Sequence, residues 1–154
     1  MFSFRSWLIA LSFIMLGSVT GCEAQPKVTI TTQDGRTIAF QVEIADTSAK
    51  REMGLQYRRE LTDDKGMIFL FPEESIQSFW MKNTPISLDM IFINRQRKIA
   101  GIVEQTLPFS LEPRSVAAPS QFVLEINGGL AKKYRLKAGD SVRFDGFARE
   151  TVSE

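Results

Sequence analysis

The stretch 66-GMIFLFPEESIQSFWMKNTPISLDMIFI-93 decides the fold of this chain. Three short apolar runs within it are separated by Pro72, by the polar segment Glu73–Ser78 and by Asn83-Thr84-Pro85. Apolar runs interrupted in this way are typical of β-strands joined by turns. Aromatic side chains are concentrated among these runs, namely Phe69, Phe71, Phe79, Trp80 and Phe92. The stretch therefore predicts several strands around an aromatic core.

Single charged residues interrupt this apolar pattern. Lys82 and Asp89 lie within the stretch, and Glu125 lies in a later apolar run. A lone charge in such a run must face solvent, find a partner or serve a function. Strand alternation places Lys82 on the face of Trp80, and turns Asp89 and Glu125 away from their apolar neighbours. A hairpin around residues 83–87 would set Lys82 opposite Asp89, and we expect Lys82, Asp89 and Glu125 to form one cluster.

Several roles are open to such a cluster. It can be a semi-buried ion pair that closes one face, although desolvation offsets much of what a pair contributes. It can be a cleft floored by Trp80, with Lys82, Asp89 and Glu125 binding a sugar or a peptide. It can also be catalytic, with Asp89 and Glu125 acting as acid and base, as in glycoside hydrolysis. We favour the structural role over a functional cleft, and binding over catalysis within the functional roles.

The strands continue on the N-terminal side of the stretch. Residues 28–32 and 37–44 alternate with period two around Asp34-Gly35, a strong hairpin signal. The second of these segments should face the core with Ile38, Phe40, Val42 and Ile44.

A short helix is predicted next. Thr47 can cap a helix through Arg58, with Met53 and Leu55 as its apolar contacts. Arg51 and Arg58 share one face of this helix at helical spacing. That face is either solvated or paired with a rim of carboxylates, which makes Arg58 a candidate binding residue.

Beyond the stretch, strands are expected at residues 99–103, 122–127 and 141–144. A proline-containing loop covers residues 107–120, and a helical turn is expected at residues 130–136. Seven or eight short strands with one or two short helices indicate a mainly β, compact single domain, built as a sandwich or barrel. We place this domain at residues 27–147 and a flexible tail at residues 148–154.

The N-terminus resembles an export signal. Arg5 precedes the apolar run Trp7–Leu16, which is shorter than the ~20 residues of a membrane span. The ending Val19-Thr20-Gly21-Cys22 resembles the lipobox of bacterial lipoproteins, in which the cysteine is lipidated and begins the mature chain. We therefore expect residues 1–21 to be removed and residues 22–26 to tether the domain to a membrane, facing the periplasm. A plain secretory signal is the alternative.

The residue after the cysteine bears on the choice of membrane. Glu23 is not the aspartate associated with inner-membrane retention, which favours the outer membrane over the inner.

Composition excludes several functions. The chain has no histidine and one cysteine, which excludes histidine-based triads and zinc sites built from these ligands. We expect no metal and no cofactor. With 19 basic and 18 acidic side chains, the chain offers no nucleic-acid footprint.

Five segments of the chain resemble the domain of unknown function 192 family (DUF192). They are Arg51-x-x-Gly54-Leu55-x-x-Arg58-x-x-Leu61, Gly66-Met67-x-Phe69-x-Phe71, Phe79-Trp80-Met81-Lys82-Asn83-Thr84-x-Ile86-x-Leu88-Asp89-x-x-Phe92-Ile93, Val123-Leu124-Glu125-Ile126-Asn127-x-Gly129 and Gly139-Asp140. The resemblance implies a small, mainly β, jelly-roll-like domain and brings no established activity.

The function expected from all of this is a small binding or accessory module, lipid-anchored in the bacterial cell envelope. Its ligand would be a cell-wall sugar or peptide. The alternatives are a histidine-free hydrolase or lyase that uses carboxylates on envelope polymer, and a purely structural envelope protein.

Overall fold

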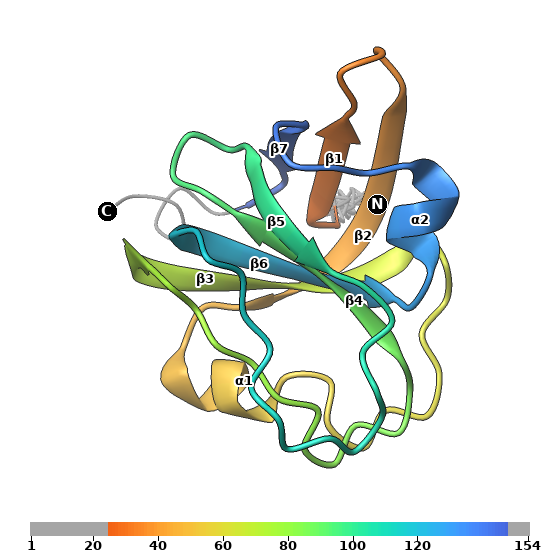
Figure 1. The fold of residues 1–154 in the computed structure, drawn as a ribbon, viewed down its shortest axis with the longest axis vertical. Helices are drawn as coiled ribbons and strands as arrows, with labels where there is room; N and C mark the ends of the chain where they lie inside the picture. Colours follow the sequence, from red (N-terminus) through yellow and green to blue (C-terminus); the bar gives the residue numbers. More distant parts are fainter. Residues whose placement is uncertain (1–24, 148–154) are drawn as a thin grey trace, which may run out of the picture.

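The computed structural model describes residues 25–147 and has one seven-stranded sheet that curls into a half-barrel (Figure 1). The strands are β1 (Lys27–Thr31), β2 (Thr37–Ala45), β3 (Lys65–Ser75), β4 (Leu88–Ile93), β5 (Ile99–Val103), β6 (Ser120–Asn127) and β7 (Ser141–Asp145). The helices are α1 (Ser48–Met53) and α2 (Leu130–Tyr134). The prediction of a mainly β domain with short helices is confirmed, and the sheet is a single curled one.

The strand order is β5-β4-β6-β3-β2-β1-β7, and only the β2–β3 pair is parallel. A parallel pair needs a crossover, and the segment containing α1 provides it. The two outer strands also meet, because Ile99 N–H donates to Asp140 C=O at 2.9 Å and Val142 N–H donates to Arg97 C=O at 2.8 Å. The sheet is therefore curled far enough for its first and last strands to be linked at one end.

Both faces of the central strands are buried. The concave interior holds one hydrophobic cluster, to which α2 contributes Leu130 and Ala131. The convex face of β3, β6 and β4 holds a second cluster, covered by Leu55, Met81 and Val116 from the connecting segments. Strand β6 consequently has seven buried residues in succession. This explains why the sequence from Phe122 to Ile126 is apolar at every position except Glu125.

The N-terminal predictions are largely confirmed. Strands β1 and β2 form an antiparallel hairpin around the predicted turn, and Phe40 and Val42 are buried. The Thr47 hydroxyl caps α1 by accepting from Lys50 N–H at 3.3 Å. The helix ends at Met53, because Gly54 adopts a φ of 48°. The expected continuation to residue 58 is therefore wrong.

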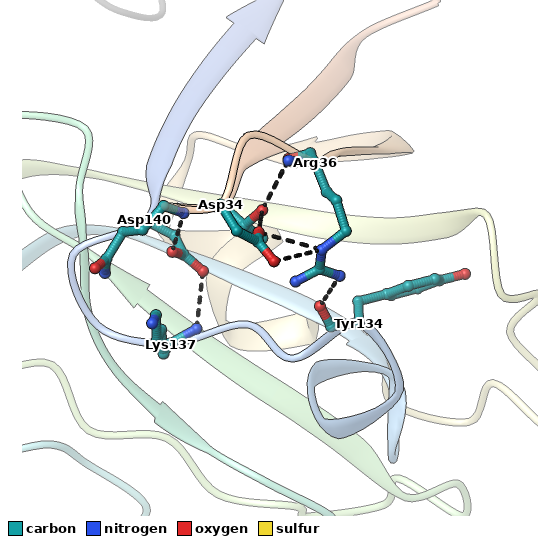
Figure 2. A network of polar contacts seen from close by, with 7 residues as sticks. Asp34, Arg36, Tyr134, Lys137 and Asp140 are labelled. Atoms are coloured by element: carbon teal, nitrogen blue, oxygen red, sulfur yellow. Dashed lines mark hydrogen bonds and ion pairs between the residues drawn. The ribbon is translucent and has the colours of Figure 1, made fainter.

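A polar network fixes the hairpin turn against the C-terminal part of the domain (Figure 2). The Asp140 carboxylate is fully buried and accepts from Gln33 N–H at 3.1 Å and from Lys137 N–H at 2.9 Å. The Arg36 guanidinium pairs with Asp34 and donates to Tyr134 C=O at 2.7 Å, at the end of α2. These contacts close one end of the half-barrel.

The predicted hairpin at residues 83–87 is wrong. Residues 79–82 do not pair with β4; Phe79 instead forms a bridge with Arg114, and Met81 N–H donates to Ser110 C=O at 2.8 Å. The long loop at 107–120 thus supplies the partner, while β4 pairs with β5 and β6.

Four predictions fall wholly or partly on residues that the structure does not describe. They are the removable segment 1–21, lipidation of Cys22, the tether at residues 22–26 and the tail 148–154. Within residues 25–147, no helix has the length and apolar character needed to cross a membrane.

Candidate functional site

Glu125 is the centre of the candidate site. It lies in the middle of β6, directly opposite Met67 of β3 on one side and Met90 of β4 on the other. Its residue exposure is 4 %. Its carboxyl group makes no hydrogen bond or ion pair with any residue between 25 and 147. Burial raises the pKa of the Glu125 carboxyl from 4.5 to about 8, so the group is mainly neutral at pH 7.

The Glu125 cavity, which this side chain helps to line, has a volume of about 240 Å³. One wall is aromatic: the Phe79 ring meets the Phe69 ring edge-on at 5.0 Å and the Phe71 ring at 6.1 Å. The opposing residues come from α1 and the turn after it, and Thr84 completes the lining. A buried, mainly neutral carboxyl group thus faces a space that has an aromatic wall and also polar lining residues, among them Glu52, Gln56 and Ser78.

Trp80 and Lys82 also line this cavity. Trp80 is 49 % exposed, and the Lys82 ammonium lies 5.1 Å from the centroid of its ring. No carboxylate within residues 25–147 forms an ion pair with Lys82. The ammonium is therefore available to a ligand, in contact with an aromatic face that stabilises it.

Arg51 is the second cation of the lining, and its guanidinium is already engaged. Nη1 donates to the carbonyls of Asp46 and Leu70 at 2.9 Å each, and the guanidinium carbon lies 5.3 Å from the Phe71 ring centroid. These contacts connect α1 to β3. Arg51 is thus mainly part of the cavity wall.

Asp89 does not belong to this site. In the β4–β6 register Met90 pairs with Glu125, whereas Asp89 pairs with Ile126 and lies on the opposite, concave face. Its fully buried carboxylate accepts from the backbone N–H groups of Gln105 at 2.7 Å, Gly129 at 3.0 Å and Ala131 at 2.7 Å. The expected cluster of Lys82, Asp89 and Glu125 is therefore wrong, and Asp89 holds the start of α2.

Arg58 is also elsewhere. Its guanidinium binds the Glu43 carboxylate through two hydrogen bonds of 2.6 and 3.0 Å on the outer side of β2. Because α1 ends before this residue, Arg58 shares no helix face with Arg51. Met53, expected as an apolar contact of that helix, is 55 % exposed.

Of the residues predicted for the site, the structure brings together Trp80, Lys82 and Glu125. The aromatic wall was missed, although the alternation in β3 contains a signal for it. Met67 lies opposite Glu125, so Phe69 and Phe71, two and four residues later, point to the same face.

The chemistry available here is that of recognition. The cavity combines an aromatic wall, a neutral carboxyl group that both donates and accepts hydrogen bonds, and a cation beside an exposed ring. Among residues 25–147, no three His, Cys, Asp or Glu side chains gather as a potential metal site.

Comparisons with known proteins agree with this fold. A DUF192 protein-family model, described as "Uncharacterized ACR", matches residues 29–144. A protein of unknown function from Novosphingobium aromaticivorans is 43% identical, with a TM-score of 0.73 over 76% of this chain and 83% of that one. A Sinorhizobium meliloti protein, whose name proposes a transcription regulator, is 38% identical, with a TM-score of 0.77 over 81% of this chain and 97% of that one. No curated protein matches. The chain belongs to the DUF192 family.

Proposed function

We propose that this protein is a lipid-anchored module of the bacterial cell envelope that faces the periplasm and binds a small ligand in the Glu125 cavity. The observation that carries the proposal is the buried carboxyl group of Glu125, which has no partner within residues 25–147 and helps to line a cavity. Burial in an apolar face disfavours a carboxyl group. The Glu125 oxygens are not among the fully enclosed, unpartnered polar atoms of residues 25–147, so they face the cavity. The position of this group in an apolar face is explained if a ligand in the cavity binds it.

The lining indicates what kind of ligand fits. A volume of about 240 Å³ suits one small ring or a short side chain. The ligand needs an apolar face for the phenylalanine wall and a hydroxyl or amide for Glu125. A sugar unit or a peptide segment of the cell wall meets both requirements.

Binding is favoured over the hydrolase or lyase alternative. Acid–base hydrolysis of a glycoside by a carboxyl pair needs both groups within ~5–10 Å across one cleft. The predicted pair cannot act together, because Asp89 and Glu125 lie on opposite faces of the sheet. The second carboxylate that lines the Glu125 cavity, Glu52, belongs to an exposed residue of α1. A purely structural role is disfavoured as well, because no ion pair within residues 25–147 closes over Glu125.

Replacing Cys22 with serine is expected to move the protein from the membrane fraction to the soluble fraction. The proposed anchor rests on the ending Val19-Thr20-Gly21-Cys22, and each buried acyl methylene contributes ~0.8 kcal/mol of membrane affinity. Fractionation with mass spectrometry of the N-terminus measures this. Glu23→Gln, which keeps the cysteine, should remain membrane-bound. Membrane-bound Cys22→Ser protein would refute the anchor.

Ligand binding is tested by a thermal-shift screen of the purified full-length protein against cell-wall sugars and peptides. A ligand that raises the melting temperature of wild type should bind Glu125→Leu at least ~10-fold more weakly, since one hydrogen-bonding contact of ~1.4 kcal/mol is lost. Glu104→Gln, a change at an exposed carboxylate, should bind as wild type does. Equal binding by Glu125→Leu, or no stabilising compound for wild type, would count against the proposed site.

A further inference from the structure

We infer that the Glu125 cavity is the central subsite of a longer groove, and that the groove binds a linear glycan strand. The inference rests on the proposed binding function and specifies its ligand. It comes from two further hollows that adjoin the Glu125 cavity at shared or neighbouring residues.

The first neighbour, the Trp80 hollow, has a volume of about 280 Å³ and is lined by Ser78, Phe79, Trp80, Leu111 and Pro113. Ser78, Phe79 and Trp80 also line the Glu125 cavity. The Trp80 side chain therefore borders both spaces. Leu111, which also lines this hollow, is 66 % exposed, so the hollow is open to a ligand that extends past Trp80.

The second neighbour, the Tyr57 hollow, has a volume of about 440 Å³ and is lined by Tyr57, Arg59, Asn83, Pro85 and Phe109. A hydrogen-bonded group connects its lining to that of the Glu125 cavity. Asn83 Nδ2 donates to Gln56 Oε1 at 3.0 Å and to Tyr57 Oη at 2.8 Å, and Gln56 lines the Glu125 cavity. The amide of Asn83 and the hydroxyl of Tyr57 thus lie beside the aromatic rings of Tyr57 and Phe109 in this hollow.

Each flanking hollow presents an exposed aromatic ring. Trp80 is 49 % exposed in one, and Tyr57 and Phe109 are 68 % and 62 % exposed in the other. These rings belong to connecting segments that cover the convex face of the sheet. Large apolar side chains that stay exposed around a cavity indicate a surface that a ligand covers.

A glycan fits these surfaces better than other linear polymers. A sugar ring has one face of C–H groups, which suits an aromatic ring, and an edge of hydroxyl groups, which suits Ser78, Asn83 and neutral Glu125. A nucleic acid needs a basic surface, whereas the net charge of this chain is +1.

An extended peptide is the other candidate, and it usually binds by adding a strand to a free edge. The segment that carries Trp80 already has a partner: Phe79 N–H donates to Arg114 C=O at 2.9 Å, and Arg114 N–H donates back at 2.7 Å. That edge is used within the protein. The three hollows therefore match a chain of sugar rings.

The test is calorimetric titration of the full-length protein with β-1,4-linked N-acetylglucosamine and glucose oligomers of one to four units. We expect Kd to fall at least 10-fold from the monosaccharide to the trisaccharide in one of the two series. Leu111→Ser and Phe109→Ser should each weaken trisaccharide binding at least 5-fold and leave monosaccharide binding unchanged. Ile76→Ser, which removes an exposed apolar side chain outside the three hollows, should change neither.

Other results would overturn the inference and can be told apart from failure of the binding function. If a monosaccharide binds through Glu125 but added units leave Kd unchanged, the groove is wrong and the small-ligand site stands. If cell-wall peptides bind and no oligosaccharide does, the glycan assignment is wrong and the site again stands. Binding of neither sugars nor peptides to wild type overturns both.

Discussion

Asp89→Ala is expected to lower the free energy of unfolding by roughly 4 kcal/mol. The wild-type carboxylate is fully buried and accepts hydrogen bonds from three backbone N–H groups, those of Gln105, Gly129 and Ala131. Alanine offers no acceptor, so these groups lose their partner in a site from which water is largely excluded. The start of α2 and the turn after β5 lose their common attachment to β4.

Urea unfolding of the purified full-length protein at pH 7 measures this loss. Asp89→Asn keeps one acceptor oxygen and should cost roughly half as much as the alanine change. Glu104→Ala, at an exposed carboxylate, serves as the control and should change stability by less than ~0.5 kcal/mol. An Asp89→Ala protein within ~1 kcal/mol of wild type would contradict the anchoring role derived from these contacts.

Glu125→Leu is expected to act in the opposite direction and stabilise the protein at pH 8 by roughly 3 kcal/mol. Leucine replaces an unpaired buried carboxyl with an apolar side chain of similar size, between Met67 and Met90. If Glu125→Leu removes the proposed ligand contact and raises stability, the result is the pattern expected where function has kept an unfavourable residue in place.

The pH dependence of this gain follows from the pKa of Glu125, which is about 8 in the folded protein against 4.5 ordinarily. Below about pH 4.5 the group is protonated in both states and adds no pH dependence to the stability. Between about pH 4.5 and 8 the unfolded chain releases the proton while the folded protein keeps it, so wild-type stability falls as pH rises. Above about pH 8 the loss is complete.

Unfolding of wild type, Glu125→Leu and Glu125→Gln at pH 5, 6.5 and 8 tests this sign. The advantage of each variant over wild type should grow with pH. Asp46 and other surface aspartates have lowered pKa values because of hydrogen bonds such as that from Lys50, and their contributions are lost only in more acidic solution. These aspartates are present in all three proteins, so their contributions cancel when each variant is compared with wild type. A variant advantage that is constant or shrinks between pH 5 and pH 8 would show that Glu125 is not buried as a neutral acid.

Local patterns in the sequence predicted the elements of this fold well. Alternation located the strands, Asp34-Gly35 located the hairpin and Thr47 located the start of α1. These signals depend on neighbours in the chain, so they could be recognised without knowing the tertiary structure. The end of α1 depends on the backbone of Gly54, and the sequence pattern did not predict it.

The site was harder to predict because both faces of the sheet are buried. Alternation correctly turned Asp89 and Glu125 away from their apolar neighbours, and both were therefore assigned to one polar cluster. Because this sheet has a hydrophobic core on each face, the Asp89 side chain enters the core on the concave face and the Glu125 side chain enters the core on the convex face. Which core each residue enters depends on the β4–β6 register, which pairs Asp89 with Ile126, 37 positions later in the chain.

The Trp80 segment illustrates a second limit. Its apolar alternation is that of a strand, yet its partner is the irregular segment around Ser110 and Arg114. A proline-containing loop gives no signal that it will act as a pairing partner. The position of Trp80 beside the Glu125 cavity therefore depended on a contact that no local pattern encodes.

The pairing of β1 with β7 has a consequence for the order of folding. Residues 27–31 and 141–145 lie side by side, so the first strand of the domain acquires its outer neighbour only when the last strand is present. Pairings between such distant segments are slow to form because a long loop must close first. During synthesis the half-barrel thus stays incomplete until almost the whole chain has been made. A chain in that state has not yet formed the closed end that Asp140 and Arg36 secure.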